Sequence, residues 1–373
     1  MSGSTVVGPD DQAETVGGPA ATARSTAWHT RLRSPGPRIL PLRYAVALLI
    51  VVTAMVLAVA SGIDPYQRDI LTTLLLYVAL AQSWNILAGF GGQVSLGISG
   101  FVGTGAYASG LVLLHTGVGY VTAVIVSALV GAALAGVLAF PLLRLRGDYF
   151  AIGSLAAALA LQAAVLNWSF AGGSTGLNLP IAGTPTPAVL FVLAILVAAL
   201  AVLAALAVQR SSFGLRLMAV RDNEPAAVGL GVSAFGHKAA ALVLSGTLSG
   251  VVGALVALQQ AAFEPGGAFS ISWTLNALLM TVVGGIATVL GPVVGAAVIY
   301  YGVTKQLADY QTAALVIEGL LLIAVVRLAP QGLWPLVCTV LRRLAAPRRS
   351  AHVHTPSLRP TRHGPDARLP KDL

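Results

Sequence analysis

The chain has 373 residues, of which 56% are hydrophobic and only 9% are Asp, Glu, Lys or Arg. About a quarter of a soluble domain is charged, so this composition excludes an ordinary soluble protein and indicates a membrane protein. The formal net charge of +9 does not indicate nucleic-acid binding, because Lys and Arg facing anionic lipid give the same excess.

The first 43 residues differ in composition from the rest of the chain. Residues 1–43 are polar, contain many small residues, and have no apolar period, so we expect a disordered tail. The first apolar run begins after this tail, too late for a cleaved secretory signal peptide. We therefore expect this run to be retained as the first membrane span.

Ten apolar segments come after this tail, with lengths close to the roughly 17–25 residues that a helix needs to cross a bilayer. They are apolar throughout rather than alternating, which favours helices over barrel strands. The expected fold is all-α and polytopic, with roughly 8–10 transmembrane helices. The third, eighth and ninth segments are short or glycine-rich, so we expect broken or re-entrant helices among them. The segments are residues 44–62, 70–88, 95–114, 120–142, 149–168, 187–208, 238–260, 273–287, 290–305 and 311–328.

The basic residues predict the orientation of these spans. With both termini in the cytoplasm, only Arg68 and Lys305 of the 22 Lys and Arg fall outside. Cytoplasmic loops are enriched in Lys and Arg, so the N-in, C-in arrangement is expected. The basic, Pro-rich segment 336–373 is then a second disordered cytoplasmic tail.

Polar residues beside glycine clusters mark two places within the membrane region. Asn85, Gln93, Ser95 and Gly97 lie where the second span ends and the third begins. Polar groups at membrane depth are tolerated when they are buried in protein or face water. This pattern fits equally a broken helix lining a translocation path and a tight, hydrogen-bonded helix crossing.

A second glycine cluster, Gly284 and Gly285, precedes Gly291 and Pro292. This pattern favours a discontinuous helix beside the path. In the seventh span, the small residues Ser245, Gly246, Ser249 and Gly250 stand four apart, and close helix packing explains them.

Residues 209–238 form the longest internal loop and the only strongly charged one. Residues 216–220 are expected to form a short helix, and Asp222 or Asn223 can cap a second one. An ordinary solvated connection is the alternative, but this order of caps and small residues favours a short helix that acts as a lever on a partner. The second helix is expected to contain Glu224, Pro225, Ala226 and Ala227, and to end at Gly229 and Gly231.

Catalytic patterns are missing from the sequence. It contains no H-E-x-x-H motif, no phosphate-binding loop and only one cysteine, Cys338. We therefore expect no catalytic residue, no metal site and no cofactor in this chain, and no enzymatic activity of its own. Glu318 is the one clear ionisable residue within a span, where it can be protonated or paired with Lys305. It leaves an ion-coupled secondary transporter or a channel for a small solute as the alternative function.

Several motifs occur in an order that resembles a known family. They are W-N-I-L-A-G-F-G-G-Q-V-S-L-G, G-x-G-A-Y, L-R-L-R-G-D-Y-F-A-I, G-G-S-T-G, F-G-x-R-L-x-A-V-R-D-N-E-x-A-A and V-V-G-G-I-A-T-x-x-G-P-V-x-G-A. Together they resemble the LivM-type permeases of branched-chain amino acid ABC importers, over about residues 70–335. Pro225 departs from the family pattern, but the first turn of a helix tolerates proline.

The resemblance implies a permease domain over residues 44–335 that works by alternating access in a prokaryotic inner membrane. Its implied partners are a second permease chain, two cytoplasmic ABC ATPases that bind ATP and Mg, and an extracytoplasmic solute-binding protein. Branched-chain amino acids or related small solutes are the implied substrates. The implied coupling residues in the 209–238 loop are Arg216, Arg221, Asp222, Glu224, Ala226, Ala227 and Gly229.

Overall fold

The computed structural model describes residues 62, 64–180 and 184–306, with single positions between 316 and 327. The predictions for both tails, for span 44–62, for Glu318 and for Cys338 concern residues outside this part. Span 311–328 lies largely outside it as well.

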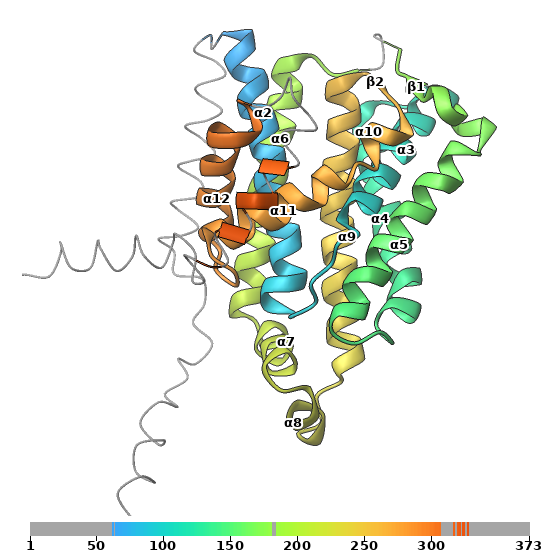
Figure 1. Ribbon diagram of the computed structural model, residues 1–373. Coiled ribbons are helices and arrows are strands. Elements are labelled where there is room, and N and C mark those ends of the chain that lie inside the picture. The colour runs from blue at the N-terminus through green and yellow to red at the C-terminus, as the bar shows by residue number, and fades with distance from the viewer. Residues whose placement is uncertain are drawn as a thin grey trace, which may run out of the picture.

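The described chain is almost entirely helical, which confirms the all-α class (Figure 1). The long helices are α2 (Pro65–Trp84), α3 (Ile98–Thr116), α4 (Tyr120–Leu142), α5 (Asp148–Leu166), α6 (Pro187–Arg210) and α9 (Ala234–Gln260). The shorter helices are α7 (Ser212–Asp222), α8 (Glu224–Gly229), α10 (Pro265–Ala268), α11 (Ile271–Gly284) and α12 (Gly291–Ile299). Single turns are η1 (Asn85–Phe90), η2 (Ser169–Ala171), η3 (Gly173–Thr175) and η5 (Tyr300–Thr304).

Seven helical runs in the described residues are long and apolar enough to cross a membrane, and Gly291–Thr304 is a shorter apolar helix. The runs correspond to predicted segments two to eight, and the shorter helix to segment nine. They are Pro65–Phe90, Ile98–Thr116, Tyr120–Leu142, Asp148–Leu166, Pro187–Arg210, Ala234–Gln260 and Pro265–Gly284.

Two helices begin earlier than the apolar runs predict. α2 starts at Pro65 rather than at residue 70, because proline suits the first helical position although the next residues are polar. α9 starts at Ala234 rather than at residue 238, because the Ser233 side chain caps it by accepting from the Gly236 N–H. Apolar runs locate the buried stretch of a helix, and caps locate its ends.

α9 lies at the centre of the bundle, against α2, α3, α4 and α6. Its small residues allow the close approach that the sequence predicts. A Cβ atom at Gly131 of α4 would collide with the Gly246 carbonyl of α9, and one at Gly253 with the Val102 carbonyl of α3. By contrast, α4 and α5 turn apolar side chains such as Leu129 and Ile152 outward, as helices facing lipid do.

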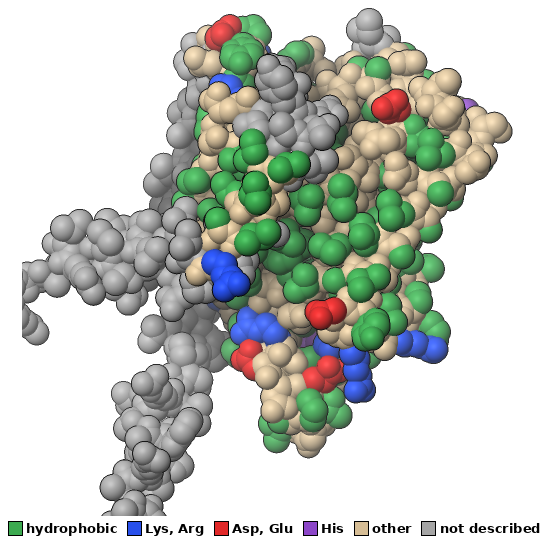
Figure 2. All heavy atoms as spheres, viewed as in Figure 1, with side chains coloured by type: hydrophobic (Ala, Val, Ile, Leu, Met, Phe, Trp, Pro, Cys, Tyr) green, Lys and Arg blue, Asp and Glu red, His purple; other side chains and the backbone are tan. Residues whose placement is uncertain are grey.

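A two-stranded antiparallel pair joins the loop after α5 to the end of α9. Strand β1 (Leu177–Asn178) pairs with β2 (Ala262–Phe263). The pair lies at the upper end of the molecule in Figure 1, and α7 and α8 project from the opposite end. Figure 2 shows most of the Lys and Arg side chains on this face near that lower end, with largely uncharged surface above them.

Candidate coupling segment and the helix break beside it

The coupling segment, residues 211–233, joins α6 to α9 through α7 and α8. The Ser211 side chain caps α7 by accepting a hydrogen bond from the Gly214 N–H at 3.1 Å. Gly214 is required there, because a Cβ atom would collide with the Val208 carbonyl. The turn from α6 into α7 is therefore tight, and α7 is longer than the predicted helix over 216–220.

Asn223 caps α8, which confirms one of the two predicted caps. Its side-chain oxygen accepts from the Ala226 N–H at 3.1 Å, and Glu224 and Pro225 occupy the first turn as expected. The helix ends at Gly229, and Gly231 follows with a φ of +82°. Such a left-handed residue favours glycine, so the chain reverses there toward α9.

The segment has a buried base and an exposed tip. Val220, Ala227 and Ala234 pack together as a small apolar cluster. Leu230 is 86% exposed and Val228 is 53% exposed at the other side of the segment. The tip of the segment therefore offers two apolar side chains that a partner could cover.

An ion pair ties α8 to α9. Lys238 Nζ lies 2.7 Å from Glu224 Oε2, and the Lys238 side chain is largely buried. This contact orients α8 on the bundle. Of the other predicted coupling residues, Arg216, Ala226 and Gly229 are exposed, and Ala227 is buried in the base of the segment.

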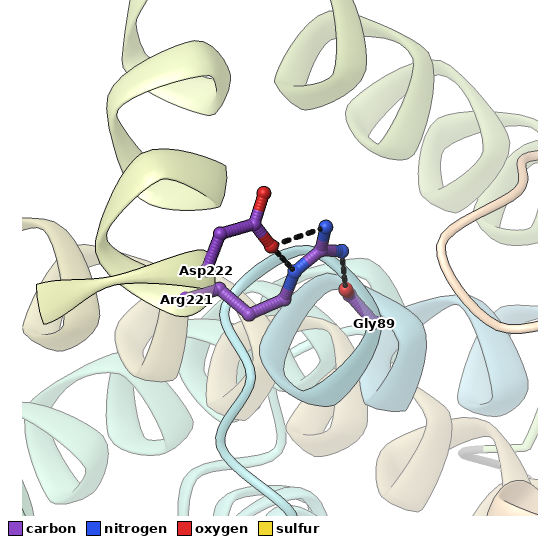
Figure 3. Close-up of polar contacts among 3 residues, drawn as sticks. All are labelled: Gly89, Arg221 and Asp222. Carbon is purple, nitrogen blue, oxygen red and sulfur yellow. Dashed lines mark hydrogen bonds and ion pairs between the residues drawn. The ribbon is translucent and has the colours of Figure 1, made fainter. Parts of the chain in front are cut away.

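Arg221 turns toward the transmembrane helices rather than away from them (Figure 3). Its Nη1 donates to the Gly89 carbonyl at 2.7 Å, and its Nε donates to Asp222 Oδ1 at 2.9 Å. Asp222 therefore holds the guanidinium in place. Gly92, with a φ of +69°, passes so close that a Cβ atom would come within 2.5 Å of Arg221 Cγ.

Gly89 belongs to η1, a π-helical turn that ends α2. A π-turn leaves backbone carbonyls without the regular helical pairing and often lies at a functional site. Here the Gly89 carbonyl accepts its bond from the coupling segment. Sequence reasoning identified this glycine cluster but missed its contact with Arg221.

Asn85, predicted on the translocation path, is fully buried and bridges two distant parts of the chain. Its Oδ1 accepts from the Ala287 N–H at 2.9 Å, and its Nδ2 donates to the Thr288 carbonyl at 2.8 Å. Gln82 adds a bond to the Val289 carbonyl. The turn between α11 and α12 is thereby fastened to the end of α2.

Gly284 and Gly285 shape that turn. A Cβ atom on Gly284 would collide with the Gly291 carbonyl, and Gly285 has a φ of +124°. The predicted break between the eighth and ninth segments is therefore present, and it lies next to Asn85.

The other three polar or glycine positions predicted beside Asn85 do not contact the α11–α12 turn in the same way. They are Gln93, Ser95 and Gly97. The Trp84 Nε1 donates to the Ser95 carbonyl at 2.9 Å, and Gly97 packs directly against the backbone of Ser154 in α5. Gln93 keeps a buried Oε1 that has no hydrogen-bond partner among the described residues. The structure thus brings Asn85, Gly284 and Gly285 together and places Ser95 and Gly97 against α5.

Comparison with known proteins agrees with this architecture. A family profile described as "Branched-chain amino acid transport system / permease component" matches residues 67–326. The chain is 28% identical to the high-affinity branched-chain amino acid transport system permease protein LivM of Salmonella typhimurium over 323 residues, 79% of this chain and 75% of that protein. The same identity and coverage hold for LivM of Escherichia coli.

A nucleoside ABC transporter permease protein, NupC of Lactococcus lactis, is 29% identical over 193 residues, 45% of this chain and 59% of that protein. No solved structure matches the chain. Since the family profile covers most of the chain, including α2 to α12, this protein belongs to the family of permease components of branched-chain amino acid transport systems.

Proposed function

We propose that this chain is the permease subunit of an ATP-driven importer for branched-chain amino acids. It works with a second permease chain, two cytoplasmic ATPases and an extracytoplasmic solute-binding protein. ATP and Mg bind to the ATPases, and this chain contributes the transmembrane path. Both termini lie in the cytoplasm of a prokaryotic cell with the chain in its inner membrane.

The observation that carries this proposal is the coupling segment. It projects beyond the transmembrane helices, exposes Leu230 and Val228 at its tip, and is fastened to the bundle at its base. A short helix with an apolar tip fits a groove on a soluble partner. An ATPase that binds this tip can therefore move the bundle when ATP closes it.

Hydrogen bonds to both ends of the η1 turn support mechanical coupling through Arg221. The guanidinium reaches Gly89 of η1, and Asn85 of the same turn is bonded to residues 287 and 288. Movement of the coupling segment would thus act on η1 and on the α11–α12 turn together. For alternating access, the ATPase must favour one of the two states by its differential binding energy.

The substrate class comes from the relatives, because both LivM proteins are named for branched-chain amino acids. The orientation rests on charge. Cytoplasmic loops are enriched in Lys and Arg, so the end where α7 and α8 project is assigned to the cytoplasm. The basic residues in or beside the loops at that end are Arg144, Arg146, Arg210, Arg216 and Lys238.

Reversing the charge of Glu224 tests the proposal. Glu224→Arg places like charges side by side at the α8–α9 contact. The Glu224 side chain is 47% exposed, so the new arginine can turn toward solvent, and we expect the contact to be lost while the chain still folds. We expect ATP-driven leucine uptake in proteoliposomes of the complete assembly to fall severalfold while ATP hydrolysis continues. The double variant Glu224→Arg/Lys238→Glu should recover most of the uptake, because it restores an ion pair at the same place.

Normal uptake by the Glu224→Arg variant would contradict the assignment of α8 as the coupling helix. Failure of the double variant to recover would instead mean that the Glu224 carboxylate itself contacts the ATPase.

A further inference from the structure

A cavity of about 240 Å³ lies between α2, α9 and α11, at the end of the molecule opposite the coupling segment. It is large enough for a small solute, since one water needs only about 10–15 Å³ on this measure. Sequence reasoning did not select any of its residues. The cavity is lined by Asp69, Thr73, Leu76, Val256, Gln259, Gln260 and Trp273.

One side of the cavity is polar and already ordered. Gln259 Nε2 of α9 donates to Asp69 Oδ1 at 2.8 Å and to Thr73 Oγ1 at 2.9 Å, both on α2. These bonds cross between two helices and hold the Asp69 carboxylate at the cavity. Thr73 Oγ1 in turn donates to the Asp69 backbone carbonyl at 3.1 Å.

Asp69 provides the charge of the cavity. No ion pair joins its carboxylate to another described residue. The ammonium of Lys305 is directed to the rings of Tyr66 and Tyr301, at 5.6 and 5.7 Å from their centres. The cavity therefore presents a carboxylate whose remaining acceptor positions suit a small cation or an ammonium group.

The other side of the cavity is apolar. Leu76, Val256 and the ring of Trp273 line it. Trp273 is held in place because its Nε1 donates to the Gly267 carbonyl at 3.1 Å and its ring packs against Tyr77. A fixed apolar wall beside a carboxylate matches a molecule with an ammonium group and a short aliphatic side chain.

We infer that this cavity is a binding site for the amino-acid substrate, in which Asp69 accepts the ammonium group and Leu76, Val256 and Trp273 contact the aliphatic side chain. The inference rests on the proposed function and on its orientation, which places the cavity on the side where the binding protein releases its cargo. Asp69, Thr73 and Gln259 then select molecules that carry an amine.

The test uses the complete permease–ATPase assembly in lipid nanodiscs, without the binding protein, and equilibrium binding of radiolabelled leucine. The variants are Asp69→Asn, which removes the charge and keeps the shape, and Asp69→Glu, which keeps the charge. Asp64→Asn is the matched control, because Asp64 is an exposed residue just before the same helix and does not line the cavity.

We expect saturable leucine binding to the unmodified assembly, and no competition by the 2-oxo acid with the same carbon skeleton. Asp69→Asn should weaken binding about tenfold or more, because a charge-assisted hydrogen bond is lost. Asp69→Glu should retain part of the affinity, and Asp64→Asn should retain all of it.

Unchanged affinity in Asp69→Asn would overturn the inference, as would the absence of leucine binding to the unmodified assembly. Loss of binding-protein docking in Asp69→Asn with leucine affinity retained would reassign the cavity to a protein contact. A separate assay tests the proposed function: ATP-driven leucine uptake by the unmodified assembly together with its binding protein. Normal uptake in this assay would support the importer function even if the cavity does not bind leucine. No uptake would refute the importer function.

Discussion

Arg221 joins the coupling segment to the end of α2 in the transmembrane bundle. Its guanidinium is held by Asp222 on one side and by the Gly89 carbonyl on the other (Figure 3). The sequence predicts that Arg221 belongs to a charged loop between two apolar spans. The orientation of the Arg221 side chain toward Gly89 could not be predicted, because Gly89 lies 132 residues away in the chain and no local pattern links it to Arg221.

Replacing Arg221 should separate ATP hydrolysis from transport. In Arg221→Gln the amide is too short to reach Gly89, so a charge-assisted bond of roughly 1.5–3 kcal/mol is lost. We expect leucine uptake to fall about tenfold or more, while the chain still inserts and still binds its ATPase. Arg146→Gln removes an exposed arginine from the α4–α5 loop and should transport normally. Equal uptake by both variants would contradict the role of Arg221.

Gly92 offers a test of the fit beside Arg221. Gly92→Ala places a methyl group at a φ of +69°, against Arg221 Cγ. Gly147→Ala is a matched control, because its φ is +55° but no atom lies within 4 Å of the added methyl. Strain alone costs about 1–2 kcal/mol. The melting temperature in detergent and the uptake should therefore fall further for Gly92→Ala, and equal losses would show that the contact with Arg221 is unimportant.

At the scale of elements, the crossing of α4 and α9 depends on glycine in both helices. Gly131→Leu drives a side chain into the Gly246 carbonyl, and a rigid backbone cannot move away. Overpacking of this kind costs about 1–3 kcal/mol. Gly136→Leu adds the same side chain to the same helix where nothing lies within 4 Å, so its thermal stability should match that of the original chain. A Gly131→Leu protein of unchanged melting temperature would show that α4 and α9 are not closely packed.

The elements themselves were largely predictable, because apolar length and helix caps are local signals. The apolar runs predict seven of the helical runs, and the pattern of Asn223, Pro225 and Gly231 predicts α8 from local sequence alone. The π-turn η1 and the bonds of Asn85 to the α11–α12 turn were not predictable. The Asn85 bonds join segments about 200 residues apart, and a single sequence does not reveal such pairings.

On the scale of the whole molecule, two distinct ends can be recognised. The end with α7 and α8 carries basic residues and an exposed apolar tip, and the other end carries the Asp69 cavity and the β1–β2 pair. α2 connects them, since Asp69 lies near its start and η1 closes its end. A partner that moves the coupling segment can thus act on a helix that also lines the cavity.

The central claim is that an ATPase binds the exposed tip of the coupling segment. The most direct measurement is purification of the tagged chain from its native membrane in mild detergent, with ATP hydrolysis assayed in the eluate. We compare the original chain, Leu230→Asp, and Leu145→Asp as a control in the α4–α5 loop at the same end. A buried carboxylate at an apolar contact is strongly unfavourable, so Leu230→Asp should lose the ATPase, whereas the other two should keep it. An eluate of Leu230→Asp with undiminished ATPase activity, or of the original chain with none, would contradict the account.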